Sequence, residues 1–315
     1  MKHLFIVNPA AGKKDQTDYV REQCARVFSG RCGDYEVYVT KAPRDAEGVI
    51  RQKAGGCDDL RVYACGGDGT LHECANGAAF LPNVTVTHFP CGTGNDFIKT
   101  FGADRALFLE LENLVDGFVR PLDLISVNDR YGLNVCSVGT DARIGANVHK
   151  YSKIPLIGGA TGYVVSMAVE FLRGISRPMD IVCGGRTFSG GITLACICNG
   201  RFYGGGFNPE PGAIPDDGVL EFIVVPKVSR LTFVRLVGDY AKGKAYRHPK
   251  EIIRLRGERL SAEAEEDFVV NLDGEIVTLR QVEFAVRPGA LRFLFPKGCT
   301  FFTDIRANSP EFCAE

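Results

Sequence analysis

A cluster of three glycines around one aspartate, in the segment CGGDGTLHE (65–73), is the first feature of this sequence that indicates chemistry. The segment follows an apolar stretch typical of a strand and precedes a stretch typical of a helix. Glycine lets the backbone approach a ligand closely, and the free N–H groups at the start of a helix favour phosphate. Thr70 is expected to cap that helix, and Asp68 is expected to be an exposed carboxylate suited to a metal ion or a nucleotide hydroxyl. A tight turn with a capped helix is the competing interpretation.

A second glycine-rich segment, PCGTGNDF (90–97), repeats this combination after another expected strand. Because the carboxyl ends of parallel strands meet along one edge of a sheet, both segments should face the same crevice. The first expected strand and the strand ending at Thr40 deliver further polar residues to that edge. Four polar loops at one edge predict a nucleotide site. Its candidate residues outside the 65–73 segment are Asn8, Gly12, Lys13, Lys14, Thr40, Gly92, Thr93, Gly94, Asn95 and Asp96.

These segments do not match the best-known nucleotide motifs. The Walker pattern GxxxxGK[ST] is absent, and no GxGxxG loop is followed by an acidic residue at the distance that binds ribose. The sequence therefore disfavours both a P-loop NTPase and a Rossmann dehydrogenase.

Two acidic segments in the second half of the chain are further candidates. The segment NLDGE (271–275) is expected to turn a hairpin at its Asp-Gly pair, and Glu275 is a candidate general base for an alcohol proton. In AIPDDGVLEF (213–222), a carboxylate such as Asp217 flanked by turn carbonyl groups is suited to a hard cation. A plain turn explains each segment as well, so neither identifies a site alone.

The order of the expected elements predicts the fold class, which is α/β plus β. The first third alternates strands and amphipathic helices, which predicts a Rossmann-like α/β nucleotide-binding domain. Later strands, among them VEFAVRPG (282–289) and LRFLF (291–295), follow one another at short spacing, which is typical of an antiparallel β-sandwich-like domain. Two helical insertions are expected in it, at 158–174 and 230–242. The predicted domains are 1–122 with the C-terminal tail from about 297 to 315, and 123–296.

The composition limits the class of protein. The 315 residues include 37 Lys and Arg against 38 Asp and Glu, and a net charge near −1 argues against a nucleic-acid binder. No run of 18 apolar residues occurs, so no membrane-spanning helix is expected. The twelve cysteines include no CxxC pair, so we expect free, mostly buried thiols in a reducing cytosol.

Together, the motifs NPAAGKK, GGDGT, PCGTGNDF, PDDG and NLDGE resemble, in this order, the diacylglycerol kinase catalytic-domain family, especially its soluble bacterial lipid kinases. The resemblance runs from Asn8 to Glu275 and spans nearly the whole chain. It implies an α/β nucleotide-binding domain and a β-sandwich-like domain, with ATP and substrate in the cleft between them. GGDGT alone would not separate this family from NAD kinases or 6-phosphofructokinases.

The resemblance also implies roles for individual residues. Glu275 matches the catalytic base, and Asp96 and Asp123 match acids of a supporting network. The implied structural Mg²⁺ site consists of Asp217 with the carbonyl groups of Ile214 and Val219. The residues implied to hold ATP and its Mg²⁺ are Asn8, Ala10, Ala11, Gly12, Lys13, Lys14, Thr40, Gly66, Gly67, Asp68, Gly69, Thr70, Gly92, Thr93, Gly94 and Asn95.

The sequence departs from the family pattern at two positions. Ala11 replaces the common serine or arginine of the NPxSG pattern, and Cys91 stands where leucine or isoleucine is usual. All of the core acids are present, so an active enzyme is expected. The apolar, glycine-rich segment GGATGYVVSMAVEFL (158–172) is expected either to line a lipid pocket or to form a core helix.

The sequence therefore predicts an ATP-dependent kinase that phosphorylates the hydroxyl of a diacylglycerol-like lipid, giving phosphatidic acid or a related phospholipid. The alternatives are an NAD kinase or other soluble-alcohol kinase and, in a different class, a non-catalytic nucleotide-binding module. The expected partner is a lipid at a membrane surface, reached from the cytoplasm by transient peripheral contact, and edge strands could pair in a homodimer. The motifs do not select among lipid acceptors.

Overall fold

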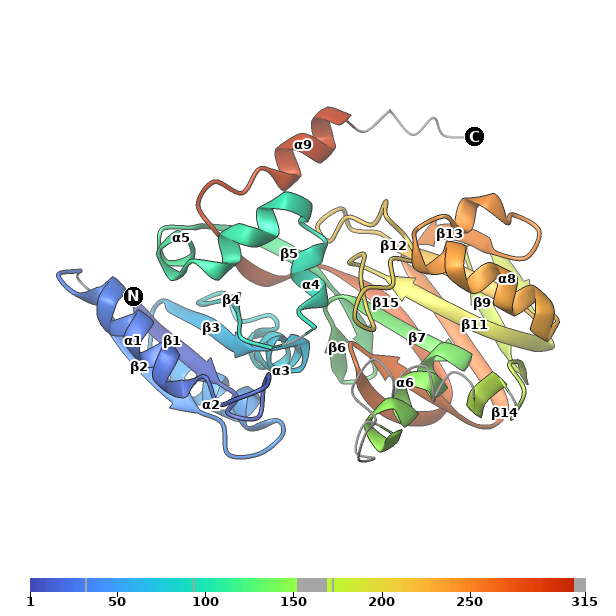
Figure 1. The fold of residues 1–315 in the computed structure, drawn as a ribbon, viewed down its shortest axis with the longest axis horizontal. Helices are drawn as coiled ribbons and strands as arrows, with labels where there is room; N and C mark the ends of the chain where they lie inside the picture. Colours follow the sequence, from blue (N-terminus) through green and yellow to red (C-terminus); the bar gives the residue numbers. More distant parts are fainter. Residues whose placement is uncertain (32, 93, 152–168, 172, 309–315) are drawn as a thin grey trace. The chain divides into compact units, whose positions relative to one another are not determined.

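The computed structural model describes residues 1–31, 33–92, 94–151, 169–171 and 173–308. The chain divides into two compact units. The first comprises Met1–Pro121 and the segment from Leu291 onward, and the second comprises Leu122–Ala290. Figure 1 labels the helices and strands of both units along the chain.

Strands and helices alternate in the first unit, as its sequence pattern predicts. Short apolar runs form the strands, and β1, β3 and β4 are buried along almost their whole length. The elements are β1 (Lys2–Val7), α1 (Thr17–Phe28), β2 (Asp34–Val39), α2 (Asp45–Ala54), β3 (Leu60–Gly66), α3 (Asp68–Ala78), β4 (Val84–Pro90), α4 (Asp96–Lys99), the 3₁₀ helix η1 (Gly102–Leu109), α5 (Leu111–Val115) and α9 (Phe301–Asn308).

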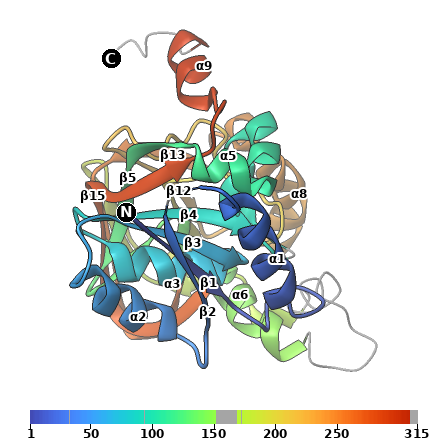
Figure 2. The same ribbon diagram turned by 90° about the vertical axis from the view of Figure 1, so that its left-hand side faces the viewer.

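The four N-terminal strands form a parallel sheet in the order β4-β3-β1-β2. Figure 2 shows α2 and α3 on one side of this sheet and α1 on the other. A sheet covered on both faces has strands that are buried along almost their whole length, as observed for β3 and β4. Because the strands are parallel, their carboxyl ends lie at one edge, and the loops that follow them begin there.

The end of the long strand β15 (Glu275–Phe295) completes the first unit. Phe293 pairs in parallel with Val86 of β4. Phe295 packs against Phe101, with ring centroids 5.2 Å apart, and Phe293 packs against Phe97 at 5.5 Å. The core of the N-terminal unit therefore contains side chains from near the C-terminus.

The second unit is built mainly of antiparallel strands. In the sequence they are short runs separated by turns. Each strand pairs either with a strand near it in the chain or with one more distant in sequence. The elements are β5 (Phe118–Val127), β6 (Arg130–Gly132), β7 (Val135–Gly139), α6 (Thr140–Tyr151), β8 (Arg177–Pro178), β9 (Asp180–Cys183), β10 (Arg186–Phe188), β11 (Gly191–Cys198), β12 (Leu220–Pro226), α8 (Arg230–Ala241), the 3₁₀ helix η2 (Ala245–Arg247), β13 (Ile253–Gly257), β14 (Arg259–Leu272) and β15.

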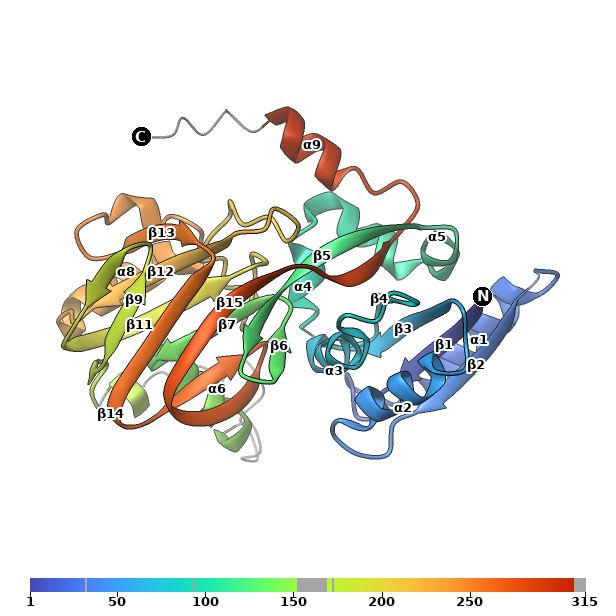
Figure 3. The same ribbon diagram turned by 180° about the vertical axis from the view of Figure 1, so that it is seen from behind.

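Strand β11 shows how the second unit buries both faces of its sheet. Alternate residues of a strand point to opposite faces. Ala195 and Ile197 join a core cluster with residues of β5, β9 and β14, whereas Leu194, Cys196 and Cys198 join a second cluster with α8. The path β13-β12-β11-β7-β14-β15 is antiparallel at every step, and Figure 3 shows β14 and β15 as long neighbouring strands.

The predicted combination of an α/β domain and a β-sandwich domain is confirmed, with one correction at β15. The runs 282–289 and 291–295 were expected as separate strands, but they belong to one strand of 21 residues. The Pro-Gly pair does not end the strand because Gly289 has a φ of 61° and its N–H group donates to Asp123 instead of a ladder partner. The helix predicted at 230–242 is α8, whereas most of the helix predicted at 158–174 lies outside the described residues. Within those described ranges, no helix has both the length and the apolarity to cross a bilayer.

Candidate active site

The loops that follow β1, β3 and β4 contact one another in the first unit; we name them the first loop (Asn8–Lys14), the second loop (Gly66–Thr70) and the third loop (Pro90–Asp96). The N–H groups of Cys91 and Gly92 donate hydrogen bonds to the Gly66 carbonyl oxygen over 2.9 and 3.0 Å. A Cβ atom on Gly12 would lie 2.8 Å from the Cys91 carbonyl oxygen. The three loops are therefore held against one another by backbone contacts.

The second and third loops pack backbone against backbone at Gly67 and Gly92. A Cβ atom on Gly92 would lie 2.5 Å from Gly67 Cα and 2.8 Å from Gly67 N. A Cβ atom on Gly66 would collide with the Thr70 side chain. Glycine is required at these positions by the packing of the loops themselves, in addition to any ligand that they hold.

Asp68 links the second loop to the third. Its Oδ2 accepts a hydrogen bond from the Asp96 N–H group at 2.9 Å, and its Oδ1 accepts one from Phe97 at 3.2 Å. Burial raises the pKa of Asp68, while His88 and the two N–H groups act in the opposite direction. The expected exposed carboxylate is thus half-buried, but each oxygen keeps a lone pair for a cation or a nucleotide hydroxyl.

The helix α3 begins with no side-chain cap. The residue at its N-cap position is Gly67, and no side chain accepts a hydrogen bond there. The prediction that Thr70 caps the helix is wrong, because Thr70 lies in the first turn. Its Oγ1 atom is buried and has no hydrogen-bond partner in the described part of the chain. Uncapped helical N–H groups favour phosphate, and a hydroxyl and a carboxylate beside them are oxygen ligands that suit Mg²⁺.

The first loop begins with a turn closed by Asn8. Asn8 Oδ1 accepts a hydrogen bond from the Ala10 N–H group at 3.0 Å, and the Asn8 carbonyl oxygen accepts one from Ala11 at 3.1 Å. The turn is followed by Lys13 and Lys14, whose side chains are exposed. Ammonium groups at this edge of the sheet are suited to phosphate oxygens.

Thr40 and Asn95 complete the polar edge. The half-buried Thr40 follows β2, and its N–H group donates to the end of β1 over 2.9 Å. Asn95 has a left-handed backbone (φ 49°), and its Nδ2 donates to the Gly92 carbonyl oxygen at 2.8 Å. Asn95 Oδ1 is buried without a hydrogen-bond partner among the residues that the structure describes. The predicted contact residue Thr93 lies outside those residues.

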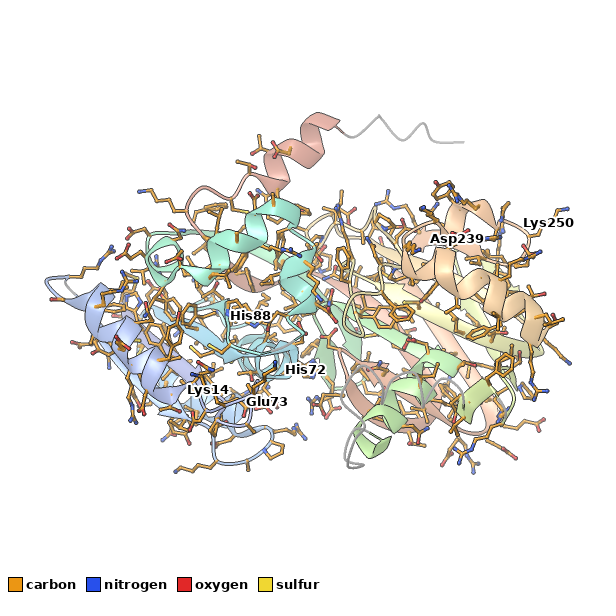
Figure 4. The ribbon with its side chains drawn as sticks, viewed as in Figure 1. Lys14, His72, Glu73, His88, Asp239 and Lys250 are labelled. Carbon is orange, nitrogen blue, oxygen red and sulfur yellow. The ribbon has the colours of Figure 1, made fainter. Side chains whose placement is uncertain are left out.

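His88, on β4 beneath the second loop, is a site residue that the sequence interpretation missed. Its Nε2 atom lies 3.1 Å from the Gly66 carbonyl oxygen, and Figure 4 marks it inside the first unit. Burial lowers the pKa of His88, and the charge of Asp68 opposes this shift. A neutral imidazole that carries its proton on Nε2 donates a hydrogen bond to the Gly66 carbonyl oxygen and holds it in place. A titratable residue in a strand that has no other one was the available signal.

In the second unit, Glu275 begins β15 directly after a two-residue hairpin turn. Asp273 and Gly274 have φ angles of 51° and 103°, which confirms the hairpin predicted for the Asp-Gly pair. The Asp273 carboxylate accepts hydrogen bonds of 2.6 to 3.0 Å from the backbone N–H groups of residues 133–135. The hairpin is therefore fixed by Asp273, whereas the Glu275 side chain is exposed.

The predicted structural Mg²⁺ ligand Asp217 has a protein cation beside it. Asp217 Oδ2 lies 2.7 Å from Arg256 Nη2, and its Oδ1 accepts a hydrogen bond from Val219 at 3.1 Å. Arg256 also pairs with Glu221 at 2.7 Å. In the structure a guanidinium group therefore occupies one oxygen of this carboxylate, and the structural Mg²⁺ site of Asp217, Ile214 and Val219 stays a prediction.

Asp123 connects three segments of the second unit. This buried carboxylate on β5 accepts hydrogen bonds from Gly218 at 2.7 Å and from Gly289 at 2.8 Å. Its own N–H group donates to the Pro215 carbonyl oxygen at 2.8 Å. Burial raises the pKa of Asp123, and the two N–H groups oppose the shift. In the structure, Asp123 holds the turn that contains Asp217 to β5 and β15.

The predicted site residues thus fall into two sets. The first set consists of the three loops of the first unit, including Asp96. The distance from Asp96 Oδ1 to Lys99 Nζ is 2.5 Å. Asp123, Asp217 and Glu275 belong to the second unit. The predicted joint action of Asp68 and Glu275 therefore stays a prediction.

An apolar pocket lies within the second unit, between α8, β11, β12 and the start of α6. It encloses about 480 Å³, part of it open to solvent. Its apolar wall includes Ile144, Leu194, Val225, Phe233 and Leu236.

Asp141 and Tyr240 contribute polar atoms to the wall of this pocket, and both belong to one hydrogen-bonded group with Tyr203. The Tyr203 hydroxyl lies 2.9 Å from Asp141 Oδ1 and 3.0 Å from the Tyr240 hydroxyl. Burial raises the pKa of Asp141, while the hydroxyl groups of Ser137 and Tyr203 oppose the shift. The sequence interpretation missed this group because its members come from three distant segments.

Comparisons with known proteins agree with both units. Residues 2–127 match the diacylglycerol kinase catalytic domain, and residues 134–295 match the YegS C-terminal NAD kinase β-sandwich-like domain. The "Diacylglycerol kinase" of Bacillus subtilis (strain 168) is 27% identical over 93% of this chain and 96% of its own length. A Pseudomonas aeruginosa (strain UCBPP-PA14) protein named "Probable lipid kinase YegS-like" is 32% identical over 91% of this chain and 93% of its own length.

The fold is similar to that of a Bacillus anthracis str. Sterne protein whose crystal structure is known, with a TM-score of 0.72. The two sequences are 25% identical, and the match covers 93% of this chain and 96% of that chain. The sequence matches cover both units and include the loops and the hairpin described above. The chain therefore belongs to the lipid kinases built on a diacylglycerol kinase catalytic domain, a family that phosphorylates an alcohol acceptor.

Proposed function

We propose that this kinase transfers the γ-phosphoryl group of ATP to the hydroxyl of a diacylglycerol-like lipid, giving phosphatidic acid or a related phospholipid. The observation that carries the proposal is the contact of three glycine loops around the uncapped start of α3. This arrangement offers backbone N–H groups, two exposed lysines and the Thr70 hydroxyl to a polyphosphate.

The proposed donor site lies on the first, second and third loops. The N–H groups of α3 and the ammonium groups of Lys13 and Lys14 would bind phosphate oxygens. Asp68 and Thr70 would hold a Mg²⁺ ion, which supplies charge neutralisation on the phosphates when it is bound. The hydrogen bonds between Asp68 and the third loop would keep these groups in place before ATP arrives.

Glu275 is the proposed general base. As the bond from the acceptor oxygen to the γ-phosphorus forms and the bond to ADP breaks, the hydroxyl proton passes to the Glu275 carboxylate. Asp273 cannot take this role because its oxygens accept three backbone N–H groups. The proposal requires Glu275 and Asp68 to serve one reaction centre.

The apolar pocket of the second unit is the proposed site for an acyl chain of the acceptor. Its wall is aliphatic and aromatic, whereas the buried group of Asp141, Tyr203 and Tyr240 offers hydrogen bonds to a polar part of the lipid. The name of the Bacillus subtilis relative supports diacylglycerol as the first acceptor to test.

The same observations weigh on the other candidate functions. An NAD kinase would bind a dinucleotide in addition to ATP, for which a pocket with a mainly apolar wall is poorly suited. A non-catalytic nucleotide-binding module would not need an exposed glutamate on a hairpin fixed by three hydrogen bonds. A lipid kinase would use both the apolar pocket and the exposed glutamate.

The deciding experiment incubates the protein with ATP labelled on the γ-phosphate and a total lipid extract in detergent, and identifies the product by mass. The expected result is label in phosphatidic acid or in another phosphorylated lipid. A parallel panel contains NAD and soluble alcohols. Label in a water-soluble product, or nucleotide binding without any transfer, would count against the proposal.

A further inference from the structure

One face of α8 and the segment after it combine exposed apolar and basic side chains. Leu231, Val234 and Tyr246 are 85%, 58% and 59% exposed, which is unusual for large apolar side chains grouped so closely in sequence. Lys242 and Lys250 belong to the same stretch of sequence and are exposed as well. We call these five residues the α8 surface, and Figure 4 labels Lys250 next to α8.

The helical period explains why α8 can bury one face and still present another. Phe233, Leu236 and Tyr240 point into the second unit and are 8%, 3% and 5% exposed. Leu231 and Val234 fall on the opposite side of the helix, because residues three or four positions apart share a face. The core of the unit is therefore complete without the two exposed side chains.

The charge of this region is opposite to that of the whole chain. From Lys227 to Glu251 there are seven Lys and Arg residues and two acidic residues, in a protein of net charge −1. Both acids already have basic side chains beside them. Asp239 lies 2.9 Å from His248, and Glu251 lies 2.9 Å from Arg235. Lys242 and Lys250 pair with no carboxylate within the described ranges, so their charge is available to an external anion.

We propose that the α8 surface docks on a bilayer that contains anionic lipid. Protruding aliphatic side chains flanked by lysines are the pattern of interfacial helices, in which apolar groups enter the acyl boundary and lysines meet anionic headgroups. The buried side of α8 lines the apolar pocket, so the same helix borders both the proposed membrane and the proposed lipid site. The choice of a bilayer as occupant rests on the proposed lipid kinase function.

The direct test is co-sedimentation of the protein with vesicles, without ATP. The vesicles contain either phosphatidylcholine alone or an equal mixture of phosphatidylglycerol and phosphatidylcholine. We expect binding to the mixed vesicles, weakened by high salt because exposed charges are then screened. Leu231→Ser with Val234→Ser, and separately Lys242→Glu with Lys250→Glu, should each weaken binding roughly tenfold.

Matched control variants come from other exposed positions. Leu109 and Val182 are 54% and 46% exposed, and their replacement by serine removes similar apolar area elsewhere. Lys2→Glu with Lys297→Glu repeats the charge change in the first unit. Both controls should keep vesicle binding within twofold of the original protein.

The outcomes separate docking from catalysis and from self-association. Kinase activity towards lipid dissolved in detergent micelles should be unchanged in the α8 variants, whereas activity on mixed vesicles should fall with binding. Absence of kinase activity in every condition would reject the proposed function while vesicle binding still stood. Equal binding of variants and controls would overturn the docking proposal, as would a dimer that the serine variant dissociates.

Discussion

At the scale of single residues, two carboxylates in one hairpin have opposite surroundings. Asp273 accepts three backbone hydrogen bonds and fixes the turn, whereas Glu275, two positions later, is exposed. A carboxylate occupied by N–H groups is a poor proton acceptor, and an exposed one can meet a substrate. The sequence motif NLDGE contains both, and the structure shows how different their surroundings are.

Glu275→Gln should reduce turnover by roughly 10²-fold or more, because the amide cannot accept the hydroxyl proton. ATP affinity should change little, since Glu275 does not belong to the loops of the first unit. Steady-state kinetics with detergent-dissolved lipid and direct ATP titration would measure the two effects. Equal losses of turnover and ATP affinity would argue against the assigned role.

His3 should make the unfolding free energy of the protein depend on pH in the acidic range. It is buried on β1, its Nδ1 lies 2.9 Å from the Tyr63 hydroxyl, and burial lowers the pKa of His3 to about 4. The unfolded chain therefore binds more protons than the folded chain between about pH 4 and 6.5. Stability is present above this window and falls as the pH drops through it.

We expect the unfolding free energy to fall by about 2 kcal/mol between pH 7 and pH 5 through His3 alone. Urea unfolding at the two pH values measures this, and His3→Gln should flatten the dependence. A variant with the same pH dependence as the original protein would remove His3 as the cause.

At the scale of elements, the donor site depends on loops that approach each other at their glycines. Gly92→Ala would place a Cβ atom 2.5 Å from Gly67 Cα, so the second and third loops would have to separate. We expect weaker ATP binding, by roughly tenfold or more, and a lower melting temperature. Gly48→Ala is the matched control, because nothing lies within 4 Å of its Cβ position in α2, and a helical alanine should stabilise by about 0.5–1 kcal/mol.

Much of this element-level arrangement can be predicted from the sequence. Apolar runs such as 60–66 and 84–90 predict the parallel strands, and topology then places their loops at one edge. The contact between Gly67 and Gly92 cannot be predicted in this way, because it depends on the backbone path of each loop. The position of Thr70 could not be predicted either. Its sequence context is typical of a helix cap, but in the structure Thr70 is a buried residue of the first helical turn.

Sequence patterns fail further where a group is assembled from distant segments. Asp141, Tyr203 and Tyr240 share one hydrogen-bonded group although they lie far apart in the chain. The pairing of Asp217 with Arg256 likewise joins residues that no local motif connects. Side chains of this kind are found only after strand order and register are known.

At the scale of the whole molecule, the cysteines should behave as inert core residues. The ten cysteines in the described part of the chain are free, and most are buried. Burial raises the pKa of Cys24 to about 12 and that of Cys91 to about 11, so little thiolate is present at neutral pH.

Reductant should therefore leave the melting temperature unchanged, and a thiol-specific reagent should label the folded protein slowly and the urea-unfolded protein quickly. Absorbance during labelling follows both rates. Rapid labelling of most thiols in the folded state, or a loss of stability on reduction, would contradict this expectation.

The strand β15 has a consequence for the order in which the protein is made. Because Phe293 pairs with β4 and Phe295 packs on Phe101, the N-terminal unit lacks part of its core until the ribosome has synthesised most of the chain. During that time β4 presents an open apolar edge that invites wrong pairing. A nascent chain halted after residue 121 should therefore recruit chaperones, although it already carries every loop of the donor site.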